Sequence, residues 1–101
     1  MTVALLTSQQ PVEALSLGSG WARDGEAVTV VLLDTATAIL RRAHEAAGTV
    51  ADARAAGVRV WAHDDAVAER TLDLRAGDVE IVDLDAVAAL LGDPETTAQW
   101  W

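Results

Sequence analysis

The sequence predicts a single α/β domain, spanning residues 1–101, in which a parallel β-sheet carries helices on both faces in flavodoxin-like layers. Short apolar runs rich in β-branched residues alternate along the chain with alanine-rich segments. The run AVTVVLL at 27–33 is almost unbroken apolar sequence, which is typical of a strand covered on both faces. Strands that alternate with helices are joined by right-handed crossovers, so we expect these strands to be parallel.

The first elements are predicted from apolar runs and the residues that interrupt them. Residues 3–6 predict the first strand, and Pro11 then stands where the first turn of a helix accepts proline. Gly18 and Gly20 lie inside that helix, where glycine lowers helix propensity. Close packing against the sheet or against a neighbouring subunit would explain both glycines. The second strand is predicted at 27–33.

A helix is predicted after the second strand. Asp34 and Thr35 end the strand and can cap this helix. Four residues are expected to form its buried stripe: Ile39, Leu40, Ala43 and Ala47. Gly48 is expected to mark its end.

The same alternation continues in the second half of the chain. The pattern Thr49-x-x-Asp52 resembles a capping box, with Asp where Glu or Gln is usual. It predicts a short helix that ends at Gly57. Residues 58–62 predict the third strand, which leads into a helix beginning at Asp64-Asp65.

The last predicted elements are a helix, a strand and a final helix. The helix from Asp64 is expected to continue to about Leu72, and residues 79–82 predict the fourth strand. Asp85 is expected to cap the final helix, which the sequence Gly92-Asp93-Pro94 stops. Four strand residues are expected in the sheet interior: Val30, Val31, Val60 and Ile81.

Composition excludes several classes of function. The net charge of −9 argues against nucleic acid or an anionic membrane as a direct partner, because both attract clustered Lys and Arg. The chain has no lysine, which excludes Schiff-base chemistry, and no cysteine, which excludes disulfides, thiolate metal sites and thiol nucleophiles. No 18-residue apolar run and no basic segment before an apolar start is present, so a cytoplasmic protein without a membrane span is expected.

Polar residues at the carboxyl ends of the predicted strands form a candidate pocket. The residues are Asp34, Thr35, His63, Asp64 and Asp65. Asp34 and His63 follow consecutive strands and can form an acid–base pair, because a carboxylate orients an imidazole. The alternative is that each Asp caps a helix and that His63 is a solvated loop residue. No zinc-type histidine spacing and no phosphate-binding glycine motif is present, so we predict no metal and no cofactor.

The segment Gln99-Trp100-Trp101 is a candidate contact with another subunit. Two adjacent indoles left free would expose a few hundred Å² of apolar surface, which is unusual for a monomer. The tail therefore predicts a homo-oligomer in which these rings meet a neighbouring protomer. The alternative is that both rings fold back onto their own domain.

Five segments in order resemble one protein family. They are VALLTSQQP, VTVVLLDTATAIL, GVRVWAHDDAVAERTL, VEIVDLDAVAALL and the terminal AQWW. Together they are similar to the DsrE/DsrF/DsrH-like sulfur-relay family, and most similar to its DsrH/TusB branch. The resemblance implies a layered α/β subunit that assembles with itself or with DsrE-like and DsrF-like subunits. It also places a persulfide-carrying cysteine just after the third strand, where this chain has Ala62-His63-Asp64-Asp65.

The resemblance and the missing cysteine together predict a non-catalytic DsrH/TusB-like subunit with a structural or regulatory role. TusB-type subunits commonly lack the persulfide cysteine. The resemblance leaves both tRNA thiolation and sulfur oxidation open as the pathway. An alternative is a small-ligand-binding protein or enzyme that uses a cleft between Asp34 and His63.

Overall fold

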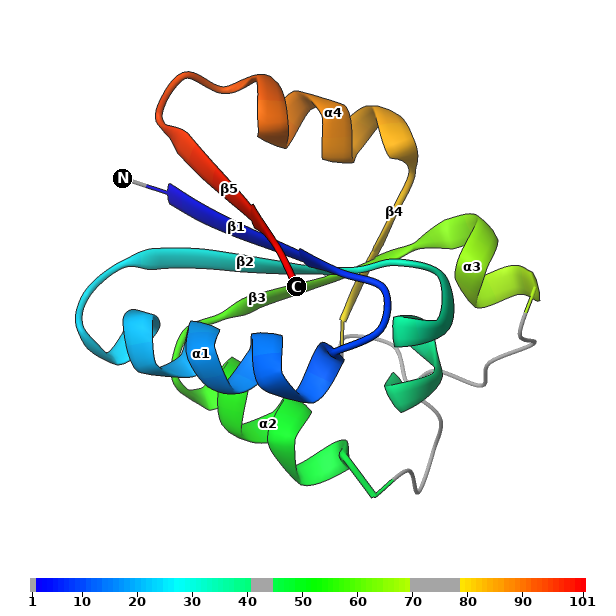
Figure 1. Ribbon diagram of the computed structural model, residues 1–101, viewed down its shortest axis with the longest axis horizontal. Coiled ribbons are helices and arrows are strands. Elements are labelled where there is room, and N and C mark those ends of the chain that lie inside the picture. The colour runs from blue at the N-terminus through cyan, green and yellow to red at the C-terminus, as the bar shows by residue number, and fades with distance from the viewer. Residues whose placement is uncertain (1, 41–44, 70–78) are drawn as a thin grey trace.

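The computed structural model describes residues 2–40, 45–69 and 79–101. The predicted fold class is confirmed, because these residues form a five-stranded sheet in the order β4-β3-β2-β1-β5 whose neighbouring strands all pair in parallel (Figure 1). The elements in chain order are β1 (Thr2–Thr7), α1 (Pro11–Arg23), β2 (Ala27–Leu32), the 3-10 helix η1 (Asp34–Leu40), α2 (Ala47–Ala55), β3 (Arg59–His63), α3 (Asp64–Glu69), β4 (Glu80–Val82), α4 (Leu84–Gly92) and β5 (Thr96–Trp100).

One face of the sheet packs against α1, α2 and η1 and holds the larger core. Leu5, Leu15 and Val30 lie in this core and are fully buried. A methyl group on Gly18 would lie 3.2 Å from both Val28 Cγ1 and Val30 Cγ2, so the expected close packing of this glycine on the sheet is confirmed. Gly20 has no neighbouring atom within 4 Å, so packing on the sheet does not explain it.

The other face of the sheet lies beneath α4. Figure 1 shows α4 on the opposite side of the strands from α1 and α2. The core here is smaller and consists of Ala4, Leu6, Val31, Trp61 and Val87. Helices cover both faces of the sheet, as predicted, and they bury the side chains of β2 that point to either face.

The helix predicted after β2 is wrong in type and extent. Residues 34–40 form η1 instead, in which the Ala36 N–H donates to the Leu33 carbonyl. Asp34 has φ 49°, a left-handed conformation that Asp tolerates better than most residues and that an N-cap residue does not adopt. Ile39 is buried as predicted, but Ala47 is exposed and begins α2. Ala43 lies outside the described residues.

The start of α2 also differs from its prediction. Gly48 lies inside this helix rather than at the end of the previous one, and Ala46 is the N-cap residue. Thr49 therefore lies within the first turn and does not cap, because α2 begins before it. The predicted end is confirmed: Gly57 has φ 104°, its N–H donates to the Arg54 carbonyl, and the helix stops there.

The final helix is capped by a different aspartate from the one predicted. Asp83 has extended backbone angles, and its Oδ1 accepts a hydrogen bond from the Ala86 N–H at 2.9 Å. Asp85 lies inside the first turn of α4. The predicted stop at Gly92 is confirmed.

Two further differences concern the edges of the sheet. Ile81 is 47% exposed rather than interior, because β4 is a three-residue edge strand, whereas α1 and α2 pack over β1, β2 and β3. A fifth strand, β5, was not predicted, and it pairs with β1. α3 begins at Asp64 as predicted, and its expected continuation to Leu72 falls outside the described residues.

Candidate functional site

The loops after β1 and β2 are tied together at the carboxyl edge of the sheet. The Leu33 N–H donates to the Thr7 carbonyl at 2.9 Å, and the Gln10 N–H donates to Thr7 Oγ1 at 3.0 Å. Thr35 lies one residue after the left-handed Asp34, and its hydroxyl donates to the Ser8 carbonyl. The Thr35 hydroxyl therefore holds two loops together.

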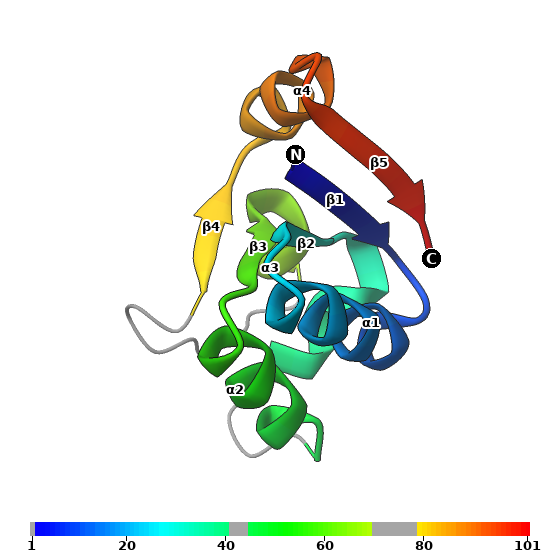
Figure 2. The same cartoon turned by 90° about the vertical axis from the view of Figure 1, so that its left-hand side faces the viewer.

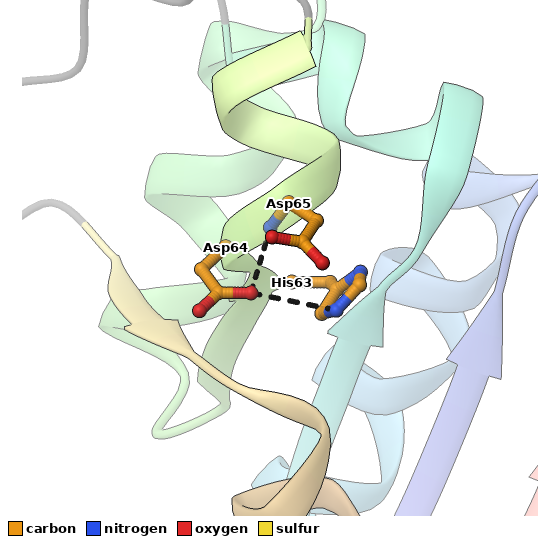
Figure 3. Close-up of side chains that lie close together, drawn as sticks. All are labelled: His63, Asp64 and Asp65. Carbon is orange, nitrogen blue, oxygen red and sulfur yellow. Dashed lines mark hydrogen bonds and ion pairs between the residues drawn. The ribbon is translucent and has the colours of Figure 1, made fainter.

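His63, Asp64 and Asp65 lie close together where β3 passes into α3 (Figure 3). His63 Nε2 is 3.4 Å from Asp64 Oδ1, and the same oxygen accepts a hydrogen bond from the Asp65 N–H at 2.7 Å. The His63 side chain is only 16% exposed, whereas Asp65 is exposed. Asp64 thus orients the imidazole and also accepts a hydrogen bond from the Asp65 N–H at the start of the helix.

The structure brings only part of the predicted pocket into direct contact. Asp34 and Thr35 lie at the end of β2, the strand next to β3, and η1 contacts both β3 and α3. All five predicted residues therefore lie at the same end of the sheet. The carboxylate that pairs with His63 is that of Asp64, its neighbour in the chain, and not that of Asp34 as the sequence predicted. The sequence did contain a signal for this pair, because an aspartate directly follows the histidine at the end of the strand.

The His63, Asp64 and Asp65 side chains offer ligand atoms that all lie within 4.8 Å of one another. An imidazole and two carboxylates are suitable donors for a divalent cation. However, the three residues are consecutive and approach from one side, whereas divalent cations take four or more ligands around them. The cluster alone therefore does not make a metal centre.

A cavity of about 320 Å³ lies at the other end of the strands, where β3 and β4 begin. The residues around it are Arg54, Gly57, Val58, Arg59, Val60, Val79 and Glu80. The Arg59 guanidinium donates to both carboxylate oxygens of Glu80 at 3.0 Å and lies 5.5 Å from the centre of the Trp61 ring. Sequence reasoning missed this cluster, although alternation along the strand places Arg59 and Trp61 on one face.

The aromatic tail is part of the sheet. Gln99 lies opposite Leu5 and Trp100 lies opposite Leu6 on β1, and the Trp101 N–H donates to the Leu6 carbonyl at 2.8 Å. The backbone of the tail therefore folds onto its own domain. Its indoles do not follow, because Trp100 remains 68% exposed and Trp101 is also exposed.

Comparison with known proteins identifies the fold. No protein-family model and no curated protein matches the sequence. The ychN protein from E. coli superposes with a TM-score of 0.79 at 16% identity, over 99% of this chain and 97% of that one. MTH1491 from Methanobacterium thermoautotrophicum, a protein of unknown function, gives 0.73 at 20% identity over 99% and 97%.

A third solved structure extends the likeness to lower identity. BT1422 from Bacteroides thetaiotaomicron, a conserved protein of unknown function, gives a TM-score of 0.67 at 9% identity, over 97% of this chain and 94% of that one. These structures share the layered α/β fold with this chain, and a shared fold does not by itself define function. In the described ranges, none of the helices combines the length and hydropathy needed to cross a bilayer.

Proposed function

We propose that this chain is a non-catalytic, DsrH/TusB-like subunit of a cytoplasmic sulfur-relay assembly, in which it has a structural or regulatory role. The observation that carries the proposal is the junction after β3. The resemblance places the sulfur-carrying cysteine there, and this chain has His63 and Asp64 at that point and no cysteine anywhere. The α/β fold and the tail ending in two tryptophans agree with the proposal.

The missing thiol determines what the subunit can do. In persulfide transfer, a thiolate attacks the terminal sulfur of a donor persulfide, a new S–S bond forms, and the donor thiolate leaves. Without a thiolate this chain cannot accept the sulfur. It can only bind, orient or regulate the cysteine-bearing subunits that do.

Native mass spectrometry tests both halves of the proposal. The protein is mixed with cysteine-bearing DsrE-like and DsrF-like proteins, and a mixed assembly is expected. When the mixture is supplied with a cysteine desulfurase and labelled cysteine, the relatives are expected to gain sulfur and this chain to keep its mass. A sulfur adduct on this chain, or no binding to any such relative, would contradict the proposal.

A gained thiol tests whether the junction after β3 is the relay position. His63→Cys would introduce the only cysteine of the chain at that junction, and Ala55→Cys on the exposed side of α2 is the matched control. We expect a persulfide-loaded relative to transfer sulfur to His63→Cys at least about tenfold faster than to Ala55→Cys, because a docked thiol reacts at high effective concentration. Equal rates would show that the junction does not face the donor.

A second candidate function is favoured by the contact of 3.4 Å between His63 Nε2 and Asp64 Oδ1. A histidine that is mostly buried and oriented by a carboxylate is a common general base, so a small-ligand-binding protein or enzyme at the carboxyl edge remains the rival proposal. His63→Ala distinguishes the two. The subunit role predicts that this variant still assembles with the relatives, whereas the rival predicts loss of a bound ligand or an activity with the fold intact.

A further inference from the structure

The two edge strands of the sheet differ in how well they are protected from pairing with another chain. Figure 2 shows β4 and β5 at opposite edges. β4 has three residues and carries Glu80, which is paired with Arg59. β5 has five residues, TTAQW, with no charged side chain and no proline. Short, charged edges resist strand addition and long, uncharged ones invite it, so β5 is the edge open to pairing.

The backbone of β5 presents alternate residues to the outside. The Trp101 N–H donates to Leu6 and the Glu95 carbonyl accepts from the Thr2 N–H, so odd-numbered residues of this segment bond to β1. The backbone groups of Ala98 and Trp100 therefore point away from the sheet. The Thr96 N–H is already used by the Asp93 carbonyl, but the Thr96 carbonyl also points outward.

The side chains on the α4 side of β5 are unequal in size. Trp100 lies opposite Leu6, which shares a core cluster with Val87 of α4, so Trp100 projects on the α4 side of the sheet. Thr96 and Ala98 project on the same side, because side chains alternate along a strand. One end of this strand face thus carries an exposed indole, and the other end carries small residues.

A second exposed apolar residue lies near the small end of β5. Leu91 is in the last turn of α4, the turn that leads through residues 93–95 into β5, and it is 41% exposed. The outer side of α4 also exposes Leu84 and Ala88, so the helix is apolar nearly all round. A helix of that composition is normally covered on all sides.

We infer that β5 pairs antiparallel with β5 of a second copy of this chain, about a two-fold axis at Ala98. The Ala98 backbone groups then bond to each other across the axis, and the Trp100 N–H donates to the Thr96 carbonyl of the second copy. Trp100 of each copy lies over the small residues Thr96 and Ala98 of the other and against its Leu91. Trp100 of one copy and Leu91 of the other therefore cover each other.

The second copy is favoured over a different protein by this self-complementarity, and charge favours β5 as the surface where two copies meet. Each chain carries −9, so two copies repel over most of their surfaces. β5 has no charge, which makes it a place where two copies can approach without opposing carboxylates. The dimer rests on the proposed subunit role in one respect: it identifies β5 as the surface through which that subunit would assemble with itself.

Site-specific cross-linking of the full chain tests the register. The chain has no cysteine, so Ala98→Cys carries a unique thiol, and in the dimer the two copies place it roughly 5 Å apart. Thr96→Cys is the matched control on the same strand, because its two thiols would be about 14 Å apart. A short bis-maleimide is expected to convert Ala98→Cys to covalent dimer and to leave Thr96→Cys unlinked. No dimer from Ala98→Cys, or the reverse preference, would overturn the inference.

Sedimentation equilibrium of the wild-type chain and three variants tests the side-chain contacts. Trp100→Ser is expected to weaken the dimer at least about thirtyfold, the loss typical of a buried aromatic at an interface. Leu91→Ser on a different element is expected to weaken it by about tenfold. Val12→Ser removes an exposed apolar side chain on the opposite face and is expected to leave the dimer unchanged. Far-UV circular dichroism verifies that each variant is folded.

The outcomes separate this inference from the proposed function. A monomeric wild-type chain, or a dimer weakened by Val12→Ser and not by Trp100→Ser, would overturn the β5 pairing. The chain can still bind cysteine-bearing relatives in that case, and the proposed function would stand. A β5 dimer that binds no such relative would support the inference and contradict the proposed function.

Discussion

At the scale of single residues, Gly18 and Gly20 look alike in the sequence and have different surroundings in the structure. A methyl group on Gly18 would press on Val28 and Val30 at 3.2 Å, whereas one on Gly20 would meet open space. Alanine is favoured over glycine within a helix by about 0.8–1 kcal/mol. We expect Gly20→Ala to stabilise the protein by about 0.5–1 kcal/mol and Gly18→Ala to destabilise it by about 1 kcal/mol, because overpacking outweighs the propensity gain.

Urea denaturation followed by circular dichroism measures both free energies of unfolding. The two variants add the same methyl group to the same helix, so each serves as the control for the other. Equal effects would show that α1 can shift away from β2 without loss.

Val31 and Ile81 form a second pair for comparison, because the sequence predicts both of them in the sheet interior. Val31 is fully buried between both layers, and Ile81 is about half exposed at the sheet edge. Val31→Ala is expected to lower the free energy of unfolding by about 1–3 kcal/mol, and Ile81→Ala by about 1 kcal/mol or less. Thermal melts of both variants measure the difference, and a larger loss at Ile81 would contradict the exposed edge position.

The same pair shows what the sequence can predict about single residues. Val30 and Val31 lie in a long apolar run. Consecutive strand residues point to opposite faces, so only a strand covered on both faces requires apolar residues at consecutive positions. The segment VEIV at 79–82 is also rich in β-branched residues, although Glu80 interrupts its apolar character beside Ile81. Its exposure depends on its place at the edge, which is decided by the order of strands far apart in the chain.

At the scale of elements, α4 allows two neighbouring aspartates to be compared. Asp83 Oδ1 accepts from the Ala86 N–H and so satisfies a backbone group that the helix leaves open, whereas Asp85 only lies near the positive end of the helix dipole. Asp83→Ala is expected to cost about 1 kcal/mol and Asp85→Ala about 0.5 kcal/mol or less. Each change removes one negative charge, so a difference between them reports the hydrogen bond.

Asp83→Asn completes the comparison, because asparagine removes the charge and can still accept the bond. Thermal unfolding at neutral pH is the measurement. If Asp83→Asn were as destabilised as Asp83→Ala, the charge of Asp83 and not its capping bond would stabilise α4.

The elements that escaped prediction share one physical cause. β5 reads TTAQW, which lacks the apolar run of β1 and β2 although it begins with two β-branched threonines. Its stability comes from pairing with β1 at the far end of the chain. The helix predicted after β2 failed at Asp34, whose φ of 49° belongs to the loop that Thr35 ties to Ser8. Local patterns predict elements that local interactions stabilise, and they miss those that depend on a distant partner.

At the scale of the whole molecule, the fold was predictable and the contacts at the site were less so. Solved structures that share only 9–20% identity with this chain have the same fold, so the fold does not depend on most individual residues. Strand ends were expected to bring His63, Asp64 and Asp65 to one edge, and they do. Which carboxylate meets His63 depends on side-chain positions within a few ångströms, and strand order alone does not determine them.

The whole-molecule charge also predicts how salt acts on the inferred dimer. Each copy carries −9, and the molecule measures 34 × 27 × 23 Å, so the centres of two paired copies are about one molecular width apart. That separation is comparable to the Debye length of about 30 Å at 0.01 M salt and well beyond the Debye length of about 8 Å at 0.15 M. β5 contributes no charged side chain, so added salt screens the general repulsion without weakening an ion pair at the axis.

The dissociation constant of the dimer is therefore expected to fall at least about tenfold between 0.01 and 0.15 M NaCl, and to change little above that concentration. Sedimentation equilibrium at a series of salt concentrations measures this, with Trp100→Ser as the control expected to stay far weaker at every concentration. Dissociation on adding salt would mean that ion pairs hold the copies together, which the uncharged β5 edge cannot provide. The assembly would then have to use the charged surfaces elsewhere on the molecule.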